Sequence, residues 1–486
     1  MRRLLVIQAA ALAREPQAPQ GPETPRPPAG IPGLDWRRAD SVLPALTCSV
    51  QASFRTASWP GEHGMVANGL FERRLRKVAF WEQSAALVSG RRIWEGYRAR
   101  GGRVGMLFWQ QSLGEQADVI LSPAPIHKHH GGMIQDCYSK PDGLYARLCR
   151  AVGRPFSLRH YWGPLASYKS GQWIAEATLA LLCDAELAPD LCLIYLPTLD
   201  YDLQRYGPDS PQAAAAHAAL EGQLAGLVRG ATSREYDVLV FGDYRIEPTG
   251  VPKRDAGDPD RDVSRLGPPS RLGSPHGAAV MPNLALAQAG LLKTRPVRDM
   301  LYPDLHQSRA FAVVDHQVAH VFIGNPADIE PARAVLSQLA GVEQVMDRTA
   351  QAAAGLAHPN GGELVLVARS GTWFAYPWWT RPGQAPDYAA HVDIHNKPGY
   401  DPCELFWGWP PPSVSRDTSR IRGSHGRVGP GNEVVWAATF EPGSTGVSPV
   451  APEHGQDARR GGRDARATCR NLVELAAGVR DWLEQE

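Results

Sequence analysis

Residues 43–68 read LPALTCSVQASFRTASWPGEHGMVAN, and this stretch is the most informative part of the chain. A Pro-containing extended segment ends at Thr47, where a helix-compatible run begins, and the loop that follows that run ends at Asn68, 21 residues later. A hydroxyl at a helix N-terminus faces unpaired backbone N–H groups and the positive end of the helix dipole. That position suits a phosphate-bearing ligand. Thr is also a common N-cap residue, and the two roles are compatible.

Short apolar runs alternate with helical patterns on both sides of this stretch. Continuous β-branched runs such as LCLIYLP at 191–197 are typical of strands buried on both faces of a parallel sheet. The alternation predicts an α/β fold, a three-layer sandwich with a mostly parallel sheet. The predicted strands are 104–109, 191–197, 238–241, 310–314, 318–323, 363–368 and 373–378, and the predicted helices are 172–182, 211–228, 328–339 and 472–484.

Composition shifts predict four parts of the chain. Residues 1–275 form the first part of the core, 276–360 a small inserted α+β cap, 361–440 the second part of the core, and 441–486 a low-complexity tail with a terminal helix. The Pro- and Gly-rich segments 14–35 and 250–275 are loops. We expect the chain to return from the cap to the main sheet near Glu363.

The bulk composition excludes several classes of partner. A formal net charge of +1 gives no field that would favour a nucleic acid polymer or an anionic membrane. No run approaches the ~18 apolar residues of a membrane span. Seven cysteines without C-x-x-C spacing favour reduced thiols and a cytoplasmic location. Residues 1–13 form either a buried first strand or a signal peptide, in which case the protein is exported. The oligomeric state stays open.

Three further motifs contain residues that bind metals in other proteins. Asp200 lies in LPTLDYDLQRYGPD, Asp243 in VFGDYRI and His425 in GSHGR. Together with residues 43–68, these motifs resemble the alkaline phosphatase superfamily and in particular its nucleotide pyrophosphatase/phosphodiesterase branch. EHGMVANG, FWEQS, DCYSKP, YWGP, DHQVAHV and KPGYDP resemble a bacterial subgroup of that branch, so the resemblance covers about residues 40 to 430.

The resemblance implies an alkaline phosphatase-like fold and a set of site residues. Thr47 would be the nucleophile, and Asn68 would contact the phosphate. Asp200, Asp243, His425 and Thr47 would bind one or two divalent metals, typically zinc, with manganese or magnesium as alternatives. No organic cofactor is implied.

Several positions depart from the family pattern. Gln204 and Tyr244 stand where the family has histidines, Gln8 stands near the place of a further Asp ligand, and Thr198 replaces a His of the subgroup. Other residues offer spare ligands, namely Asp315, His316, His320, Asp393, His395 and Asp401, together with Glu404. The cluster of His127, His129 and His130 is either a metal site or a solvent-exposed loop.

The sequence therefore predicts a metal-dependent hydrolase that cleaves phosphodiester, pyrophosphate or phosphomonoester bonds of a small phosphorylated substrate through a Thr nucleophile. Two alternatives remain open. One is a catalytically impaired family member that binds a phosphorylated metabolite, and the other is a phosphotransferase.

Overall fold

The computed structural model describes residues 1–13, 31, 33–129, 132–250, 279–443 and 469–485. His130, most of the two loop segments and most of the low-complexity tail lie outside the described residues.

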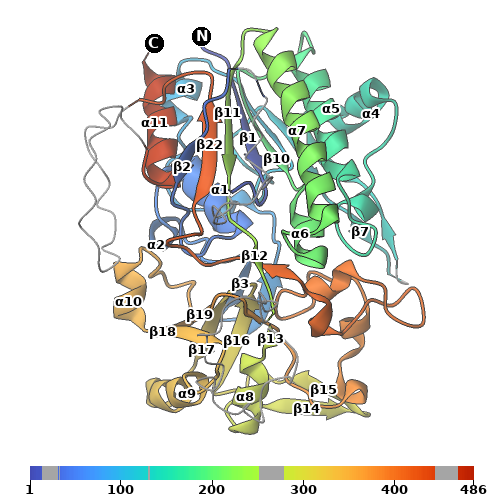
Figure 1. Ribbon diagram of the computed structural model, residues 1–486, viewed down its shortest axis with the longest axis vertical. Coiled ribbons are helices and arrows are strands. Elements are labelled where there is room, and N and C mark those ends of the chain that lie inside the picture. Colours follow the sequence, from blue (N-terminus) through green and yellow to red (C-terminus); the bar gives the residue numbers. More distant parts are fainter. Residues whose placement is uncertain (14–30, 32, 130–131, 251–278, 444–468, 486) are drawn as a thin grey trace, which may run out of the picture.

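An eight-stranded sheet forms the centre of the larger part of the molecule (Figure 1). Its middle five strands are parallel, and the three outer pairings are antiparallel, which confirms a mostly parallel sheet. In spatial order the strands are β2 (Arg37–Ala39), β22 (Val434–Ala438), β11 (Asp237–Gly242), β1 (Leu4–Ala9), β10 (Leu191–Leu196), β5 (Val104–Leu107), β6 (Val119–Pro123) and β9 (Cys137–Lys140).

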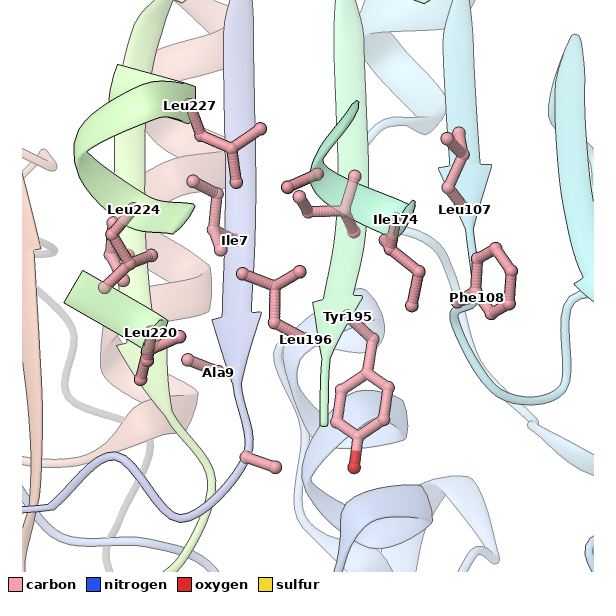
Figure 2. Close-up of a cluster of buried hydrophobic side chains, with 14 of the residues drawn as sticks. Ile7, Ala9, Leu107, Phe108, Ile174, Tyr195, Leu196, Leu220, Leu224 and Leu227 are labelled. Atoms are coloured by element: carbon pink, nitrogen blue, oxygen red, sulfur yellow. The ribbon is translucent and has the colours of Figure 1, made fainter. Parts of the chain in front are cut away.

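Strand β1 lies at the centre of this sheet, so the strand interpretation of residues 1–13 is confirmed. Its side chains alternate between two apolar clusters. Leu5 and Ile7 belong to the cluster drawn in Figure 2, whereas Leu4 and Val6 belong to a second one. The side chains on both faces of the strand are therefore buried from solvent, as the continuous apolar pattern predicts.

Helices supply the other walls of the two clusters and complete the predicted three layers. On the face of Leu5 and Ile7 lie α4 (Leu144–Val152), α5 (Lys169–Leu182), α6 (Asp200–Tyr206) and α7 (Pro211–Thr232). On the opposite face lie α1 (Thr47–Thr56), α3 (Glu95–Ala99) and α11 (Leu472–Glu484). The short helix α2 (Pro60–His63) follows α1.

A second, four-stranded antiparallel sheet packs in its own apolar cluster, with helices α8 (Pro282–Gln288) and α9 (Ile329–Leu336). Its strand order is β16 (Ala310–Asp315), β17 (Val318–Ile323), β19 (Leu364–Ala368) and β18 (Val342–Met346), and α10 (Arg348–Ala353) follows β18. In Figure 1 this sheet lies at the end of the molecule opposite both termini.

The expected return to the main sheet near Glu363 is wrong. The strand predicted there exists, but it is β19, and it pairs with β17 and β18 of the small sheet. An apolar pattern identifies a strand and not its partner, because pairing is decided by long-range packing. The next strand, β20 (Trp373–Phe374), pairs with β13 (Ala279–Val280), and the main sheet is rejoined only at β22. The division into domains otherwise stays a prediction.

The remaining strands form two-stranded ribbons: β3 (Gly69–Glu72) with β4 (Lys77–Phe80), β7 (Ile126–His127) with β8 (Met133–Ile134), β12 (Glu247–Pro248) with β21 (Gly423–Ser424), and β14 (Thr294–Val297) with β15 (Met300–Pro303). None of the helices among the described residues is long and apolar enough to cross a membrane.

Candidate active site

The candidate site lies at the carboxyl ends of three adjacent parallel strands. Gln8 is near the end of β1, Asp200 follows β10 as the first residue of α6, and Asp243 follows β11. Ligands of open α/β sheets bind at this edge. The tip of the β16–β17 hairpin reaches the same place, because the Gln317 N–H donates to the carbonyl of His425 at 2.8 Å.

Thr47 is the first residue of α1 and is 3 % exposed. Leu46 is the N-cap residue, and no side chain caps the helix from that position, so the interpretation of Thr47 as the N-cap is wrong. The Thr47 side chain lies close enough to the Tyr244 phenol to oppose the rise in the pKa of Tyr244 that burial causes. The Thr47 side chain therefore lies beside Tyr244 in the site.

Asp200 accepts two side-chain hydrogen bonds, one on each carboxyl oxygen. Tyr244 Oη donates to Oδ1 at 2.8 Å, and Gln204 Nε2 donates to Oδ2 at 2.8 Å. Burial raises the pKa of Asp200 to about 6, and the two hydrogen bonds oppose that rise. Gln204 is itself held, since Tyr400 Oη donates to its Oε1 at 2.7 Å.

Asp243 is fully buried and accepts three hydrogen bonds. Its Oδ1 accepts the backbone N–H groups of Ala11 at 3.0 Å and Tyr244 at 2.9 Å, and its Oδ2 accepts Gln8 Nε2 at 2.7 Å. Burial raises the pKa of Asp243 to about 8 against these bonds. The Oε1 atom of Gln8 is buried without a partner.

Four buried aromatic rings stack in a row beside the two carboxylates. The ring centroids are 3.4 Å apart for Tyr244 and His425, 3.8 Å for His425 and His316, and 3.6 Å for His316 and Tyr400. Burial holds the pKa values of both histidines well below the ordinary value, so both are neutral. His425 Nδ1 lies 2.9 Å from the Ala45 carbonyl and donates to it, which leaves Nε2 as an acceptor, 3.9 Å from Asp200 Oδ1.

Asn68 links α1 to the small sheet. Its Oδ1 accepts the Cys48 N–H at 3.0 Å, while its backbone N–H and Nδ2 donate to Asp315 at 2.8 and 3.2 Å. Asn68 therefore caps the first turn of α1. Its amide retains one further N–H, so the expected phosphate contact stays a prediction. Asp315 also accepts His316 Nδ1 at 2.8 Å, and burial raises the pKa of Asp315 to about 7.

Of the spare ligands, only His316 and its neighbour Asp315 join the site. Both ring nitrogens of His320 are used, with Nε2 3.0 Å from the Val66 carbonyl and Nδ1 accepting the Gly362 N–H at 3.1 Å. Residues 393–395 do not form a strand, so Asp393 and His395 do not share a strand face.

The other spare ligands are held by the fold elsewhere. Asp393 accepts from Asn396, and His395 Nδ1 lies 3.0 Å from the Phe80 carbonyl. Asp401 and Glu404 pair with Lys397 at 2.8 and 2.7 Å. Each of these residues has a structural partner away from Thr47, Asp200 and Asp243, and the ligand role expected for them stays a prediction. His129, on its own loop, is not part of the site either.

The residues present do not fit the expected divalent metals. Among the described residues, no group of three or more His, Cys, Asp or Glu is arranged to hold a metal ion. A catalytic zinc site needs about three protein ligands. Here every oxygen of Asp200 and Asp243 accepts an N–H or O–H donor, so Asp200, Asp243, His425 and Thr47 do not make up the expected ligand set.

Tyr400 is the site residue that sequence reasoning missed. It lies in the Lys-Pro-Gly-Tyr-Asp-Pro turn, whose unusual composition was the available signal.

A helix-covered parallel sheet, a small antiparallel sheet and polar residues at their junction define an α/β protein of the alkaline phosphatase-like class. The family model of type I phosphodiesterase / nucleotide pyrophosphatase matches residues 33–401, and the chain belongs to this family. It is a phosphoester hydrolase by membership of that family, whose members are metal-dependent hydrolases.

Solved structures of one phosphonoacetate hydrolase share the fold. Phosphonoacetate hydrolase from Sinorhizobium meliloti 1021, in complexes with phosphonoformate and with phosphonoacetate, is similar with a TM-score of 0.55 and 16% identity, over 98% of this chain and 95% of that chain. Murine ectonucleotide pyrophosphatase / phosphodiesterase 5 has a TM-score of 0.49 and 12% identity, over 99% of this chain and 95% of that chain. No curated protein matches the chain.

Proposed function

We propose that this chain cleaves phosphodiester, pyrophosphate or phosphomonoester bonds of a small phosphorylated substrate, with Thr47 as the nucleophile. The observation that carries the proposal is the place of Thr47 at the start of the ten-residue helix α1, beside the phenol of Tyr244. The positive end of the α1 dipole favours a phosphate at this position.

The chain's own hydrogen bonds supply a path for the proton of the nucleophile. Thr47 Oγ1 attacks phosphorus in line, and the bond from phosphorus to the leaving oxygen breaks. The Thr47 proton passes to Tyr244 Oη, whose own proton passes to Asp200 Oδ1 at 2.8 Å. In the second step water attacks the phosphothreonine, and Thr47 recovers its proton along the same path. No step is assigned to zinc, manganese or magnesium, because the ligand set for them is not assembled.

Replacement of Thr47 tests this function. We expect Thr47→Ala to lose at least ~10³-fold in turnover of bis-p-nitrophenyl phosphate or p-nitrophenyl phosphate, since no nucleophile remains. Thr47→Ser should retain measurable turnover. The matched control is Thr56→Ala at the other end of α1, where the hydroxyl donates to the Ala52 carbonyl at 2.7 Å. Full turnover by Thr47→Ala would refute the proposal.

One observation favours the alternative of a catalytically impaired binding protein. The side chains of Thr47, Asp243 and His425 are all buried, with exposed fractions of 3 %, 0 % and 1 %. In that case the wild type shows no turnover but binds a phosphate ester in calorimetry.

A phosphotransferase is recognised by transfer of the phosphoryl group to added glycerol. A cytoplasmic location also stays a prediction.

A further inference from the structure

The two buried carboxylates of the site are held by neutral donors where the family has metal-binding residues. We infer that this site works without bound divalent metal ions, because Gln8, Gln204 and Tyr244 donate hydrogen bonds to the carboxylate oxygens that a cation would need. The inference rests on the proposed function for the reaction at Thr47, but metal content can be measured without any turnover.

A connected set of neutral donors holds both oxygens of the Asp200 carboxylate. Tyr244 Oη and Gln204 Nε2 each lie 2.8 Å from a different oxygen of this group. The amide orientation of Gln204 is set by Tyr400, whose hydroxyl donates to Oε1 at 2.7 Å. Gln204 therefore presents N–H, and not carbonyl oxygen, to Asp200. A cation at Asp200 would have to compete with these two neutral donors, which occupy one lone-pair site on each oxygen.

The backbone and Gln8 likewise donate hydrogen bonds to both oxygens of the Asp243 carboxylate. Two backbone N–H groups hold Oδ1, and Gln8 Nε2 holds Oδ2 at 2.7 Å. The remaining free acceptor here is Gln8 Oε1, which is buried without a partner. A single neutral amide oxygen is too few ligands for zinc, which takes about three from the protein.

His425 offers one ring nitrogen, Nε2, as a possible metal ligand, because its Nδ1 donates to the Ala45 carbonyl. Its Nε2 faces Asp200 Oδ1 at 3.9 Å, while its ring is stacked between Tyr244 and His316. His316 Nδ1 is bonded to Asp315. Even if Asp200 gave up a donor, His425 and Asp200 would supply two ligands, fewer than a catalytic zinc site requires.

The test measures metal content with and without the three donors. The wild-type full chain is dialysed against buffer with micromolar zinc and manganese and then against metal-free buffer, and bound metal is counted by elemental mass spectrometry. We expect fewer than about 0.1 equivalents per chain, and one to two in the triple variant Gln8→Asp, Gln204→His, Tyr244→His, which supplies carboxylate and imidazole ligands. Zinc should raise the melting temperature of the triple variant and not that of the wild type.

Two controls keep the result interpretable. His129→Asn removes an imidazole from the exposed loop, so metal that this variant loses is bound outside the site. If the triple variant does not fold, as judged by near-UV circular dichroism, the single variant Gln204→His takes its place, with an expected gain of bound zinc over the wild type.

A wild type that carries one or more equivalents of metal, and loses them in Asp200→Asn, would overturn the inference. Failure of the proposed function is a separate result, because it is seen as unchanged turnover of Thr47→Ala at any metal content.

Discussion

At the scale of single residues, Tyr244 connects more of the site than any other side chain. Its hydroxyl donates to Asp200 and lies beside Thr47, its ring stacks on His425, and its backbone N–H donates to Asp243. A histidine at this position would offer a ring nitrogen to a metal. The phenol instead connects the nucleophile to a carboxylate, which makes this substitution consistent with retained chemistry.

Tyr244→Phe removes that connection while it keeps the stacked ring. We expect turnover to fall by about 10²- to 10⁴-fold, the usual contribution of a positioned acid–base group. The free energy of unfolding should fall by about 1–3 kcal/mol, because one oxygen of buried Asp200 loses its donor. Steady-state kinetics and urea unfolding measure the two effects.

The matched control is Tyr400→Phe, which removes the donor to Gln204 Oε1 and leaves the contact between Thr47 and Tyr244 in place. Tyr400→Phe should lower the free energy of unfolding by about as much as Tyr244→Phe does. It should lower turnover much less. Equal losses of turnover in both variants would show that Tyr244 acts only by packing.

At the scale of elements, the junction of β11 with the following loop places Asp243. Gly242 ends β11 so close to the loop after β1 that an added Cβ would lie 1.7 Å from the Leu12 carbonyl oxygen. Because that neighbour is backbone, it cannot rotate away. This close approach keeps Asp243 within reach of the Ala11 N–H.

Gly242→Ala should therefore destabilise the protein by about 3 kcal/mol or more, at the upper end of overpacking costs. The control is Gly222→Ala within α7, where an added Cβ meets nothing within 4 Å. Because Ala is the better helix former, this change should stabilise the protein by about 1 kcal/mol. Thermal and urea unfolding compare the two variants, and a neutral Gly242→Ala would contradict the close approach.

At the scale of the whole molecule, burial shifts the pKa values of several ionisable groups away from their ordinary values, and these shifts act on stability with opposite signs. Burial lowers the pKa of His63 to about 3 and of His320 to about 4. The unfolded chain takes up these protons below pH ~6.5, so this stability is present above pH 6.5 and is lost as the pH falls. The raised pKa values of Asp200, Asp243 and Asp315 act the other way.

The contribution of His63 is isolated by His63→Asn, whose side-chain oxygen can accept the Met65 N–H in place of Nδ1. Between pH 7 and pH 5 we expect the wild type to lose about 2 kcal/mol more of unfolding free energy than this variant. The control is His391→Asn at an exposed histidine. Urea unfolding at both pH values measures the difference, and parallel curves for the wild type and His63→Asn would refute the assignment.

Much of the fold could be predicted because its elements have strong local patterns. The predicted strand 318–323 and helix 472–484 have the bounds of β17 and α11. Apolar periodicity depends on residues a few positions apart, and it survives whatever those elements pack against. The residues that follow strands β10 and β11, Asp200 and Asp243, could be placed at one edge for the same reason.

The sequence by itself determined the α/β class, the family and the position of Thr47 at a helix start, because these depend on neighbours along the chain. Only the tertiary structure decided that β19 joins the small sheet and that Tyr400, through Gln204, fixes the donor to Asp200. The physical reason is that hydrogen bonds and stacking between residues as distant as 204 and 400 depend on atomic positions. Those positions exist only after the two sheets have packed together.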